Sequence, residues 1–294
     1  MAAFEDRSIR TPDGLKLHYR DYAGPSGLPP ILCLPGLTRN CRDFEGVAGR
    51  LAGEWRVIAP DFRGRGESQA DPNSMNYRPD VYVGDMLKLL DQLGIADAVF
   101  IGTSLGGIVT MLLAHGDEER VAGALLNDIG PEVDPRGIER IRSYVGKPQQ
   151  WSNWGDAAAA FGLAQRDVFP NWQPSDWERF ARRTCRELAD GAIALHYDMA
   201  IKEPFASANE GTQPNLWPLL GGLRDRPVTV IRGATSDLFA AEVAERMIDA
   251  LGEQAELVTV PGIGHAPTLE EPECVAAIDR LLARVRARVE TSPL

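Results

Sequence analysis

The sequence predicts an α/β protein in which a mainly parallel sheet is covered by helices on both faces and interrupted by a helical insertion. Short apolar runs, typical of buried strands, alternate with amphipathic stretches at helical spacing along residues 15–126 and again along residues 228–289. Between these halves lies a long stretch without a convincing strand. The alternation favours a parallel sheet, because a crossover helix returns the chain to the end of the sheet from which the next parallel strand starts.

The first half predicts five strands and three helices. Leu15–Arg20 alternates apolar and polar residues, as an edge strand does, and the helical spacing of Val81–Leu93 stops at Gly94, a helix-ending signal. The other predicted strands are the apolar runs Ile31–Leu34, Val57–Ala59, Ala98–Ile101 and Ala122–Leu126, and the other predicted helices are Arg42–Ala52 and Leu105–Ala114. The second half adds strands Val228–Ile231 and Leu257–Val260 and helices Ala240–Leu251 and Pro272–Val289.

The stretch between the halves predicts a helical cap. We expect residues 1–130 and 215–294 to form the core and residues 131–214 the cap, above the carboxyl edge of the sheet, where open α/β sheets bind ligands. The cap is rich in aromatic residues, which either pack its helices or line an apolar pocket: Trp151, Trp154, Phe161, Phe169, Trp172, Trp177, Phe180, Tyr197 and Phe205.

Charge and composition narrow the class of partner. A formal net charge of −11 over 294 residues argues against nucleic acid and anionic membranes as partners, since both repel such a surface. No apolar run approaches the roughly 20 residues of a membrane helix, and the N-terminus lacks the apolar segment of a secretory signal. The four cysteines form no CxxC pair and are expected to be reduced and mostly buried. We therefore expect a cytoplasmic protein, monomer or homodimer.

The strongest local signal is Gly102-Thr103-Ser104-Leu105-Gly106, which fits G-x-S-x-G between a predicted strand and a predicted helix. A serine on such a tight turn needs small neighbours two residues away on each side, and both are glycine. Its hydroxyl would lie at a helix N-terminus, where unpaired N–H groups favour developing negative charge. The pattern therefore predicts Ser104 as a nucleophile.

A nucleophilic serine needs a base and an acid that orients the base. His265 follows the last predicted strand, so it can reach a nucleophile at the same sheet edge. Asp237 follows the penultimate strand and lies between Ser104 and His265 in chain order, as this type of triad requires. Asp128, which follows the strand after Ser104, is the rival. We prefer Asp237 as the acid.

With these residues in place, the chain resembles the α/β-hydrolase superfamily over nearly its whole length outside the cap. It matches the family's turn at Leu34–Leu37, where Pro35 replaces the usual histidine, and the D-x-R-G-x-G-x-S loop at Asp61–Ser68. The resemblance implies an α/β-hydrolase fold and an oxyanion hole formed by the backbone N–H groups of Leu37 and Leu105. It also implies that Asp61 and Arg63 have structural roles.

The nucleophile limits the reaction. Relatives that open epoxides or remove halides use a carboxylate at this turn, whereas Ser104 favours attack on a carbonyl carbon through an acyl-enzyme. We predict a hydrolase of carboxylic esters or lactones of small, largely apolar molecules, which needs no metal or organic cofactor. Carbon–carbon bond hydrolysis of vinylogous diketones and slow-turnover ligand sensing remain alternatives, as do thioester and amide hydrolysis. Arg39 could meet a substrate carboxylate, although a structural role is the simpler interpretation.

Overall fold

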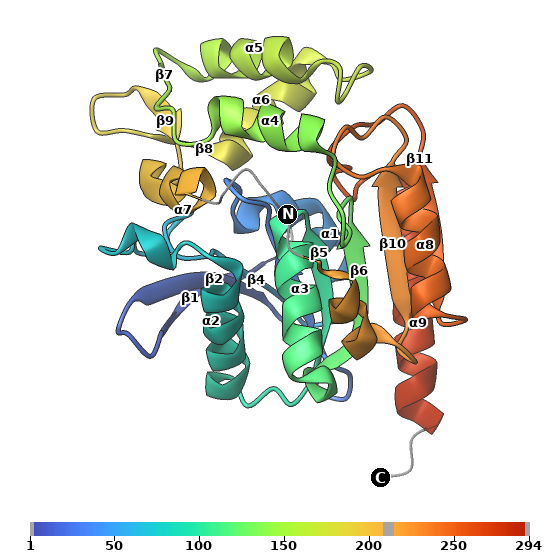
Figure 1. Cartoon of the computed structure of the whole chain (residues 1–294). Helices are drawn as coiled ribbons and strands as arrows, with labels where there is room; N and C mark the ends of the chain where they lie inside the picture. The colour runs from blue at the N-terminus through green and yellow to red at the C-terminus, as the bar shows by residue number, and fades with distance from the viewer. Residues whose placement is uncertain (1–2, 208–214, 292–294) are drawn as a thin grey trace.

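The computed structural model describes residues 3–207 and 215–291. Its centre is an eight-stranded sheet in the order β1-β2-β4-β3-β5-β6-β10-β11 (Figure 1). The first two strands pair antiparallel, β2 is also antiparallel to β4, and all the strands from β4 to β11 in that order are parallel. The strands are β1 Glu5–Arg10, β2 Lys16–Tyr22, β3 Ile31–Leu34, β4 Val57–Pro60, β5 Ala98–Thr103, β6 Val121–Asn127, β10 Val228–Gly233 and β11 Ala255–Val260. This confirms the predicted α/β fold class.

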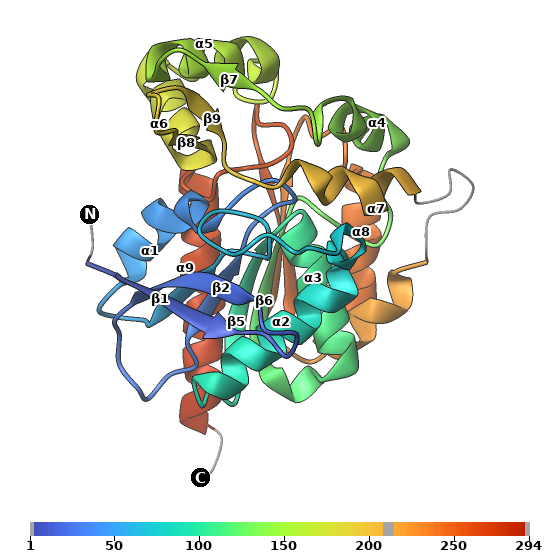
Figure 2. The same cartoon turned by 90° about the vertical axis from the view of Figure 1, so that its left-hand side faces the viewer.

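Two layers of helices cover the sheet (Figure 2). One core cluster joins the sheet to α2, α3 and α8, and a second cluster on the other face joins it to α1 and α9. Neighbouring residues of a strand divide between the clusters: in β3, Leu32 and Leu34 belong to the first and Ile31 and Cys33 to the second. The strands β3 and β4 are apolar at every position because both faces of the sheet are covered. The helices are α1 Glu45–Leu51, α2 Pro79–Gln92, α3 Leu105–Gly116, α8 Ala241–Leu251 and α9 Pro272–Thr291.

The edge of the sheet differs from the sequence prediction. The strand predicted at Leu15–Arg20 is β2, and it is the second strand in the sheet rather than the edge. The edge strand on this side of the sheet is β1, whose residues are mostly exposed and charged, with only Ile9 buried. Its sequence carries no apolar run, because hydrogen bonds to β2 rather than a buried face hold it in the sheet.

Above the carboxyl ends of the parallel strands lies a group of smaller elements (Figures 1 and 2). They are α4 Pro135–Tyr144, β7 Gln150–Trp151, α5 Trp154–Gln165, α6 Pro174–Thr184, β8 Cys185–Glu187, β9 Ile193–Leu195 and α7 Lys202–Ser207. The expectation that this stretch has no strands is wrong, since β7, β9 and β8 form a three-stranded antiparallel sheet. Strands of two or three residues leave no periodic pattern in a sequence.

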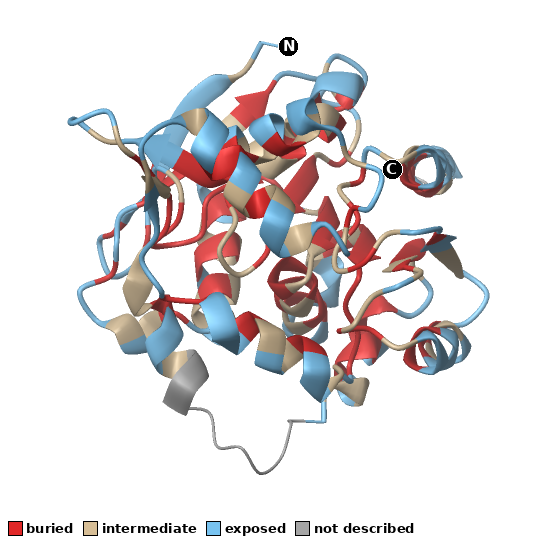
Figure 3. Ribbon diagram, turned by 90° about the horizontal axis from the view of Figure 1, so that it is seen from above, coloured by how far each residue is buried: buried red, intermediate tan, exposed pale blue. Residues whose placement is uncertain are grey.

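This upper region has an apolar core of its own. Aromatic side chains from α5, α6 and the loop between them pack together, with Phe161, Phe169 and Trp177 buried. The predicted cap boundary at Pro214 lies outside the described residues, as does the side chain of Phe205, so the division at 131–214 stays a prediction. Seen from above, buried residues gather in the middle of the molecule and exposed ones around its rim (Figure 3).

Two expectations drawn from composition can be compared with the described residues. All four cysteines are buried and none forms a disulfide, as predicted. None of the helices in residues 3–207 and 215–291 is long and apolar enough to cross a membrane.

Candidate active site

Ser104 lies on the tight turn between β5 and α3. Its backbone has φ +51° and ψ −113°, in a region that residues other than glycine rarely adopt. The two flanking glycines have physical reasons to be glycine. A Cβ on Gly102 would lie 2.5 Å from the backbone of Gly106, and a Cβ on Gly106 would lie 2.1 Å from the carbonyl oxygen of Leu34. The spacing of the sequence pattern therefore reflects close backbone packing around the serine.

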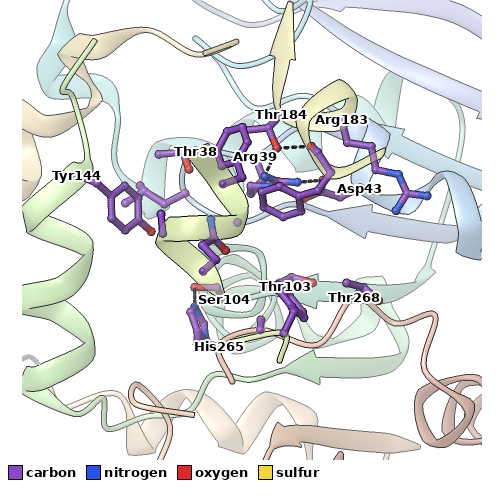
Figure 4. A pocket seen from close by; sticks show the side chains of 18 of the residues that line it. Thr38, Arg39, Asp43, Thr103, Ser104, Tyr144, Arg183, Thr184, His265 and Thr268 are labelled. Carbon is purple, nitrogen blue, oxygen red and sulfur yellow. Dashed lines mark hydrogen bonds and ion pairs between the residues drawn. The ribbon is translucent and has the colours of Figure 1, made fainter. Parts of the chain in front are cut away.

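His265 reaches Ser104 from the loop after β11. Its Nε2 lies 3.1 Å from the Oγ of Ser104 (Figure 4). Two contacts hold the histidine loop in place: the N–H of Gly264 donates to the carbonyl of Val168 at 2.9 Å, and the side-chain amide of Asn127 donates to the carbonyl of Pro267 at 2.9 Å. The predicted nucleophile and base thus lie within hydrogen-bond distance of each other.

Asp128 completes a hydrogen-bonded series with these two residues. Its Oδ2 lies 2.7 Å from the Nδ1 of His265, and the carboxylate is fully buried. Asp128 directly follows β6 and has φ +55°, a left-handed conformation that aspartate tolerates better than most residues. A carboxylate on Nδ1 fixes the imidazole tautomer that leaves Nε2 free to accept the serine proton.

The structure thus places Asp128, and not the preferred Asp237, against His265. The Asp237 carboxylate binds the guanidinium of Arg140 through two hydrogen bonds of 2.5 and 2.8 Å. Hydrogen bonds from Arg140 lower the pKa of Asp237, although partial burial opposes that shift. Asp237 thus holds a residue of α4, while Asp128 holds His265.

Sequence reasoning could find the two candidate acids but could not rank them. β6 and β10 are neighbours in the sheet, so Asp128 and Asp237 both follow strands that end beside each other. The partner that draws Asp237 away is Arg140, which lies 97 residues earlier in the chain. Sequence reasoning also missed Ser236, whose hydroxyl donates to Asp128 Oδ2 at 2.6 Å.

The predicted oxyanion hole consists of the N–H groups of Leu37 and Leu105. In the part of the chain that the structure describes, neither N–H has a hydrogen-bond acceptor. Leu105 begins α3 directly after Ser104, and Leu37 follows β3 and lines the cavity described below. The buried Arg65 donates from Nε to the carbonyl of Leu37 at 2.9 Å and so holds the turn. The assignment of an oxyanion hole to these two groups remains a prediction.

Asp61 and Arg63 make contacts that suit the structural roles implied by the resemblance. The buried carboxylate of Asp61 accepts the N–H groups of Cys41 at 2.7 Å and Glu67 at 3.0 Å. The guanidinium of Arg63, also buried, binds Asp85 and Asp71 at 2.5 and 2.6 Å. Neither residue lines the cavity.

A cavity of about 950 Å³ lies over Ser104 and His265. Its far wall is aromatic and comes from the region above the sheet, through Trp151, Phe161, Phe169, Trp172 and Phe180. The rest of the wall is more polar than the predicted apolar pocket. Four arginines and four acidic residues line it: Arg39, Arg140, Arg179, Arg183, Asp43, Asp176, Glu270 and Glu271.

The arginines in this wall already have carboxylate partners. Arg39 binds Asp43 through hydrogen bonds of 2.8 and 2.5 Å and donates to Thr184 (Figure 4). Its guanidinium also stacks on the ring of Phe180. Arg183 binds Glu270 at 2.7 Å. These contacts favour a structural role for Arg39 over recognition of a substrate carboxylate.

One cluster offers the residue types of a metal site. The ligand atoms of His18, Cys41 and Asp61, all buried, lie within 4.8 Å of one another. Both nitrogens of His18 are already bonded, Nδ1 to Asp61 at 2.7 Å and Nε2 to Asp6 at 2.8 Å. Burial raises the pKa of the Cys41 thiol well above its usual value, which disfavours the thiolate that a metal needs. The cluster is a hydrogen-bonded unit that needs no ion.

Comparison with known proteins agrees with this architecture. The model of the alpha/beta hydrolase family matches residues 31–278, from β3 into α9. The chain belongs to this family. A crystal structure of an alpha/beta hydrolase from Novosphingobium aromaticivorans is 51% identical, covers 97% of this chain and 99% of its own, and superposes with a TM-score of 0.92.

Two relatives of this alpha/beta hydrolase have described activities. The 3-hydroxybutyrate-oligomer hydrolase of Cupriavidus necator is 33% identical over 274 residues, which cover 90% of this chain and 92% of the relative. The 2-(acetamidomethylene)succinate hydrolase of Mesorhizobium japonicum is 26% identical over 83% of this chain and 84% of the relative. These matches support hydrolysis as the general reaction of the chain.

Proposed function

We propose that the protein is a serine hydrolase that cleaves carboxylic esters or lactones through an acyl-enzyme. The observation that carries this proposal is the series Ser104–His265–Asp128, with contacts of 3.1 and 2.7 Å, at the wall of a large cavity. A nucleophile, a base and an acid in this order are the parts that acyl transfer requires.

In the proposed reaction, His265 Nε2 removes the proton of Ser104 as Oγ attacks the carbonyl carbon. Asp128 stabilises the imidazolium that forms. The N–H groups of Leu37 and Leu105 bind the oxyanion, and each such donor lowers the barrier by about 3 kcal/mol. His265 then protonates the leaving alcohol, and water repeats the sequence on the acyl-enzyme to release the acid.

The cavity supports substrates with a polar as well as an apolar part. Its aromatic wall suits acyl or alicyclic groups, and its ion-paired wall suits ester and hydroxyl oxygens rather than a second unpaired charge. Oligomers of 3-hydroxy acids are chains of esters with this mixed character. Because a relative at 33% identity is a hydrolase of 3-hydroxybutyrate oligomers, short oligomers of this type are the first natural substrates to test.

The test is turnover of p-nitrophenyl esters from acetate to decanoate, several lactones, and the linear dimer and trimer of 3-hydroxybutyrate. Wild type is compared with Ser104→Ala and with Ser152→Ala, which removes an exposed serine hydroxyl that does not line the cavity. We expect Ser104→Ala to lower kcat by about 10⁶-fold and Ser152→Ala to leave it unchanged.

A vinylogous diketone in the same panel distinguishes ester hydrolysis from the main alternative, carbon–carbon bond hydrolysis. Cleavage of the diketone with no ester or lactone turnover would replace the proposal with carbon–carbon bond hydrolysis. Binding of panel compounds with no turnover of any would favour a ligand sensor. Equal ester turnover by wild type and Ser104→Ala would refute the serine mechanism.

A further inference from the structure

The carboxylate of Asp128 is fixed by contacts beyond His265. Its Oδ1 accepts the N–H of Gly233 at 2.8 Å, and its Oδ2 accepts the hydroxyl of Ser236 at 2.6 Å. Oδ2 is also the oxygen that lies 2.7 Å from His265 Nδ1. One oxygen of the acid is therefore shared between the base and Ser236, a residue of the loop after β10.

The surroundings of Ser236 determine the direction of its hydrogen bond. Its oxygen accepts the backbone N–H groups of Phe239 at 3.1 Å and Leu238 at 3.3 Å. A hydroxyl has one proton to donate and two lone pairs to accept with. Both lone pairs face N–H donors, so the single proton points at Asp128. The hydroxyl is held in one orientation, as a donor to the oxygen that orients the imidazole.

Ser236 has no direct access to the reacting atoms. It does not line the cavity over Ser104, within the part of the chain described. Its neighbour Asp237 binds Arg140 of α4, which fixes the loop from its other side. Its hydrogen bond to Asp128 is the direct link between Ser236 and His265.

We propose that Ser236 is a positioning residue that holds the carboxylate of Asp128 in the orientation that His265 needs. The proposal rests on the function proposed above, since it assigns Asp128 as the acid. Without the hydroxyl, Oδ2 keeps only its contact with the imidazole, and the carboxylate can turn about its remaining bond to Gly233. Misplacement of a catalytic group by about 1 Å can cost roughly a hundredfold in rate.

The test compares Ser236→Ala, Ser236→Thr and Ser236→Cys with wild type on the best ester of the panel. Ser236→Ala is expected to lower kcat by about tenfold to a hundredfold, with KM within about threefold of wild type since Ser236 does not touch substrate. Ser236→Thr, which keeps the hydroxyl, should restore most of kcat. Thr235→Ala, the matched control, removes an exposed hydroxyl from the same loop and should match wild type.

A double variant separates positioning from general support of the loop. In an Asp128→Asn background, Ser236→Ala should change kcat by less than about twofold, because residues that act through one another are not additive. The rate at which a fluorophosphonate labels Ser104 gives the same comparison for variants too slow for turnover assays. A further loss in that background as large as in wild type would show a structural role and overturn the proposal.

Two other results test the proposed role of Ser236. If circular dichroism shows that Ser236→Ala does not fold, Ser236→Cys replaces it, because a thiol is a weaker donor of similar size. The fall in kcat for Ser236→Cys should be smaller than that for Asp128→Asn. In the Asp128→Asn background, Ser236→Cys should again change kcat by less than about twofold. Full kcat in a folded Ser236→Ala overturns the positioning role alone if Ser104→Ala is inactive. Activity retained in Ser104→Ala overturns the proposed function, and the role of Ser236 falls with it.

Discussion

Two histidine–aspartate pairs among the described residues have the same contact and different surroundings. In both, an aspartate Oδ2 lies 2.7 Å from a histidine Nδ1: Asp128 with His265, and Asp61 with His18. The pairs differ at the other ring nitrogen. Nε2 of His265 faces the hydroxyl of Ser104, whereas Nε2 of His18 binds a second carboxylate, that of Asp6.

The difference shows what suits such a pair to act as a base. An aspartate on Nδ1 orients the ring in both places, but only His265 has a neutral proton donor at Nε2 and a place in the cavity wall. His18 lies between two carboxylates that favour its charged form. Burial alone would lower the pKa of His18, yet the hydrogen bonds and charges of Asp61 and Asp6 outweigh it and raise that pKa.

The largest effect on kcat is expected from a variant that breaks the pair of Asp128 and His265. Asp128→Asn keeps the shape of the side chain but no longer holds the imidazole in the tautomer that accepts the serine proton. We expect kcat on the best ester to fall by about 10⁴-fold, as removal of the acid does in serine proteases. Steady-state kinetics measure the change, with folding checked by circular dichroism. A fall of less than tenfold would mean that Asp128 is not the acid.

The next variant tests the choice between Asp128 and Asp237 as the acid. Asp237→Asn weakens the contact with Arg140 and leaves Asp128 beside His265. We expect less than a tenfold change in kcat, and a loss of stability of about 1 kcal/mol or less, since partly exposed ion pairs contribute little.

The pH dependence of stability gives a second readout for Asp237. The pKa of Asp237 is lowered in the folded protein, so its ion pair stabilises the fold at pH values above the unfolded pKa of about 3.9. That contribution is lost as the pH falls through the lower, folded pKa. Urea unfolding at pH 6 and pH 3 should show the difference between wild type and Asp237→Asn shrinking at pH 3. Arg140→Met should lose as much stability as Asp237→Asn. A loss of kcat in Asp237→Asn as large as in Asp128→Asn would assign Asp237, and not Asp128, as the acid.

A smaller effect on activity is expected from a substitution in the pair of His18 and Asp61. His18→Leu should change kcat by less than about twofold, because His18 does not line the cavity, yet it leaves the buried Asp61 without one charged partner. Loss of such a hydrogen bond costs about 1.5–3 kcal/mol of stability.

The pH dependence of that loss has the opposite sign to that of Asp237. The pKa of His18 is raised by folding, so its stabilisation is complete below the unfolded pKa of about 6.5 and is lost as the pH rises through the folded pKa. The stability difference between wild type and His18→Leu should be larger at pH 6 than at pH 9. An equal difference at both values would show that the charge of His18 contributes nothing.

The smallest effect tests the second carboxylate on His18. Asp6 is largely exposed, with a side chain 63% accessible, so Asp6→Asn should leave activity unchanged and alter stability only slightly. It should lower the pKa of His18, which NMR titration of the ring protons measures directly. An unchanged titration would mean that Asp61 alone raises this pKa.

How far the sequence predicts the site depends on the range of the contacts. The small residues around Ser104 and the placement of His265 after the last strand follow from local geometry, and both predictions agree with the structure. The choice between Asp128 and Asp237 depends on Arg140, which is distant in sequence. The preferred Asp237 binds Arg140, and Asp128 is the aspartate that contacts His265. The fold follows the same rule: the apolar central strands were predicted, whereas the charged edge strand β1, held by hydrogen bonds to β2, was not.

The contact between Gly264 and Val168 has a consequence for engineering this enzyme. The residue before His265 donates its N–H to a carbonyl in the loop between α5 and α6, and a Cβ on Gly264 would lie 3.2 Å from the Cα of Val168. The loop between α5 and α6, which contributes Phe169 and Trp172 to the aromatic wall of the cavity (here called the cavity roof), therefore also supports the backbone that carries His265. A chimaera that exchanges this roof for that of another hydrolase, to change specificity, must keep a carbonyl at the position of Val168 or adjust the histidine loop with it.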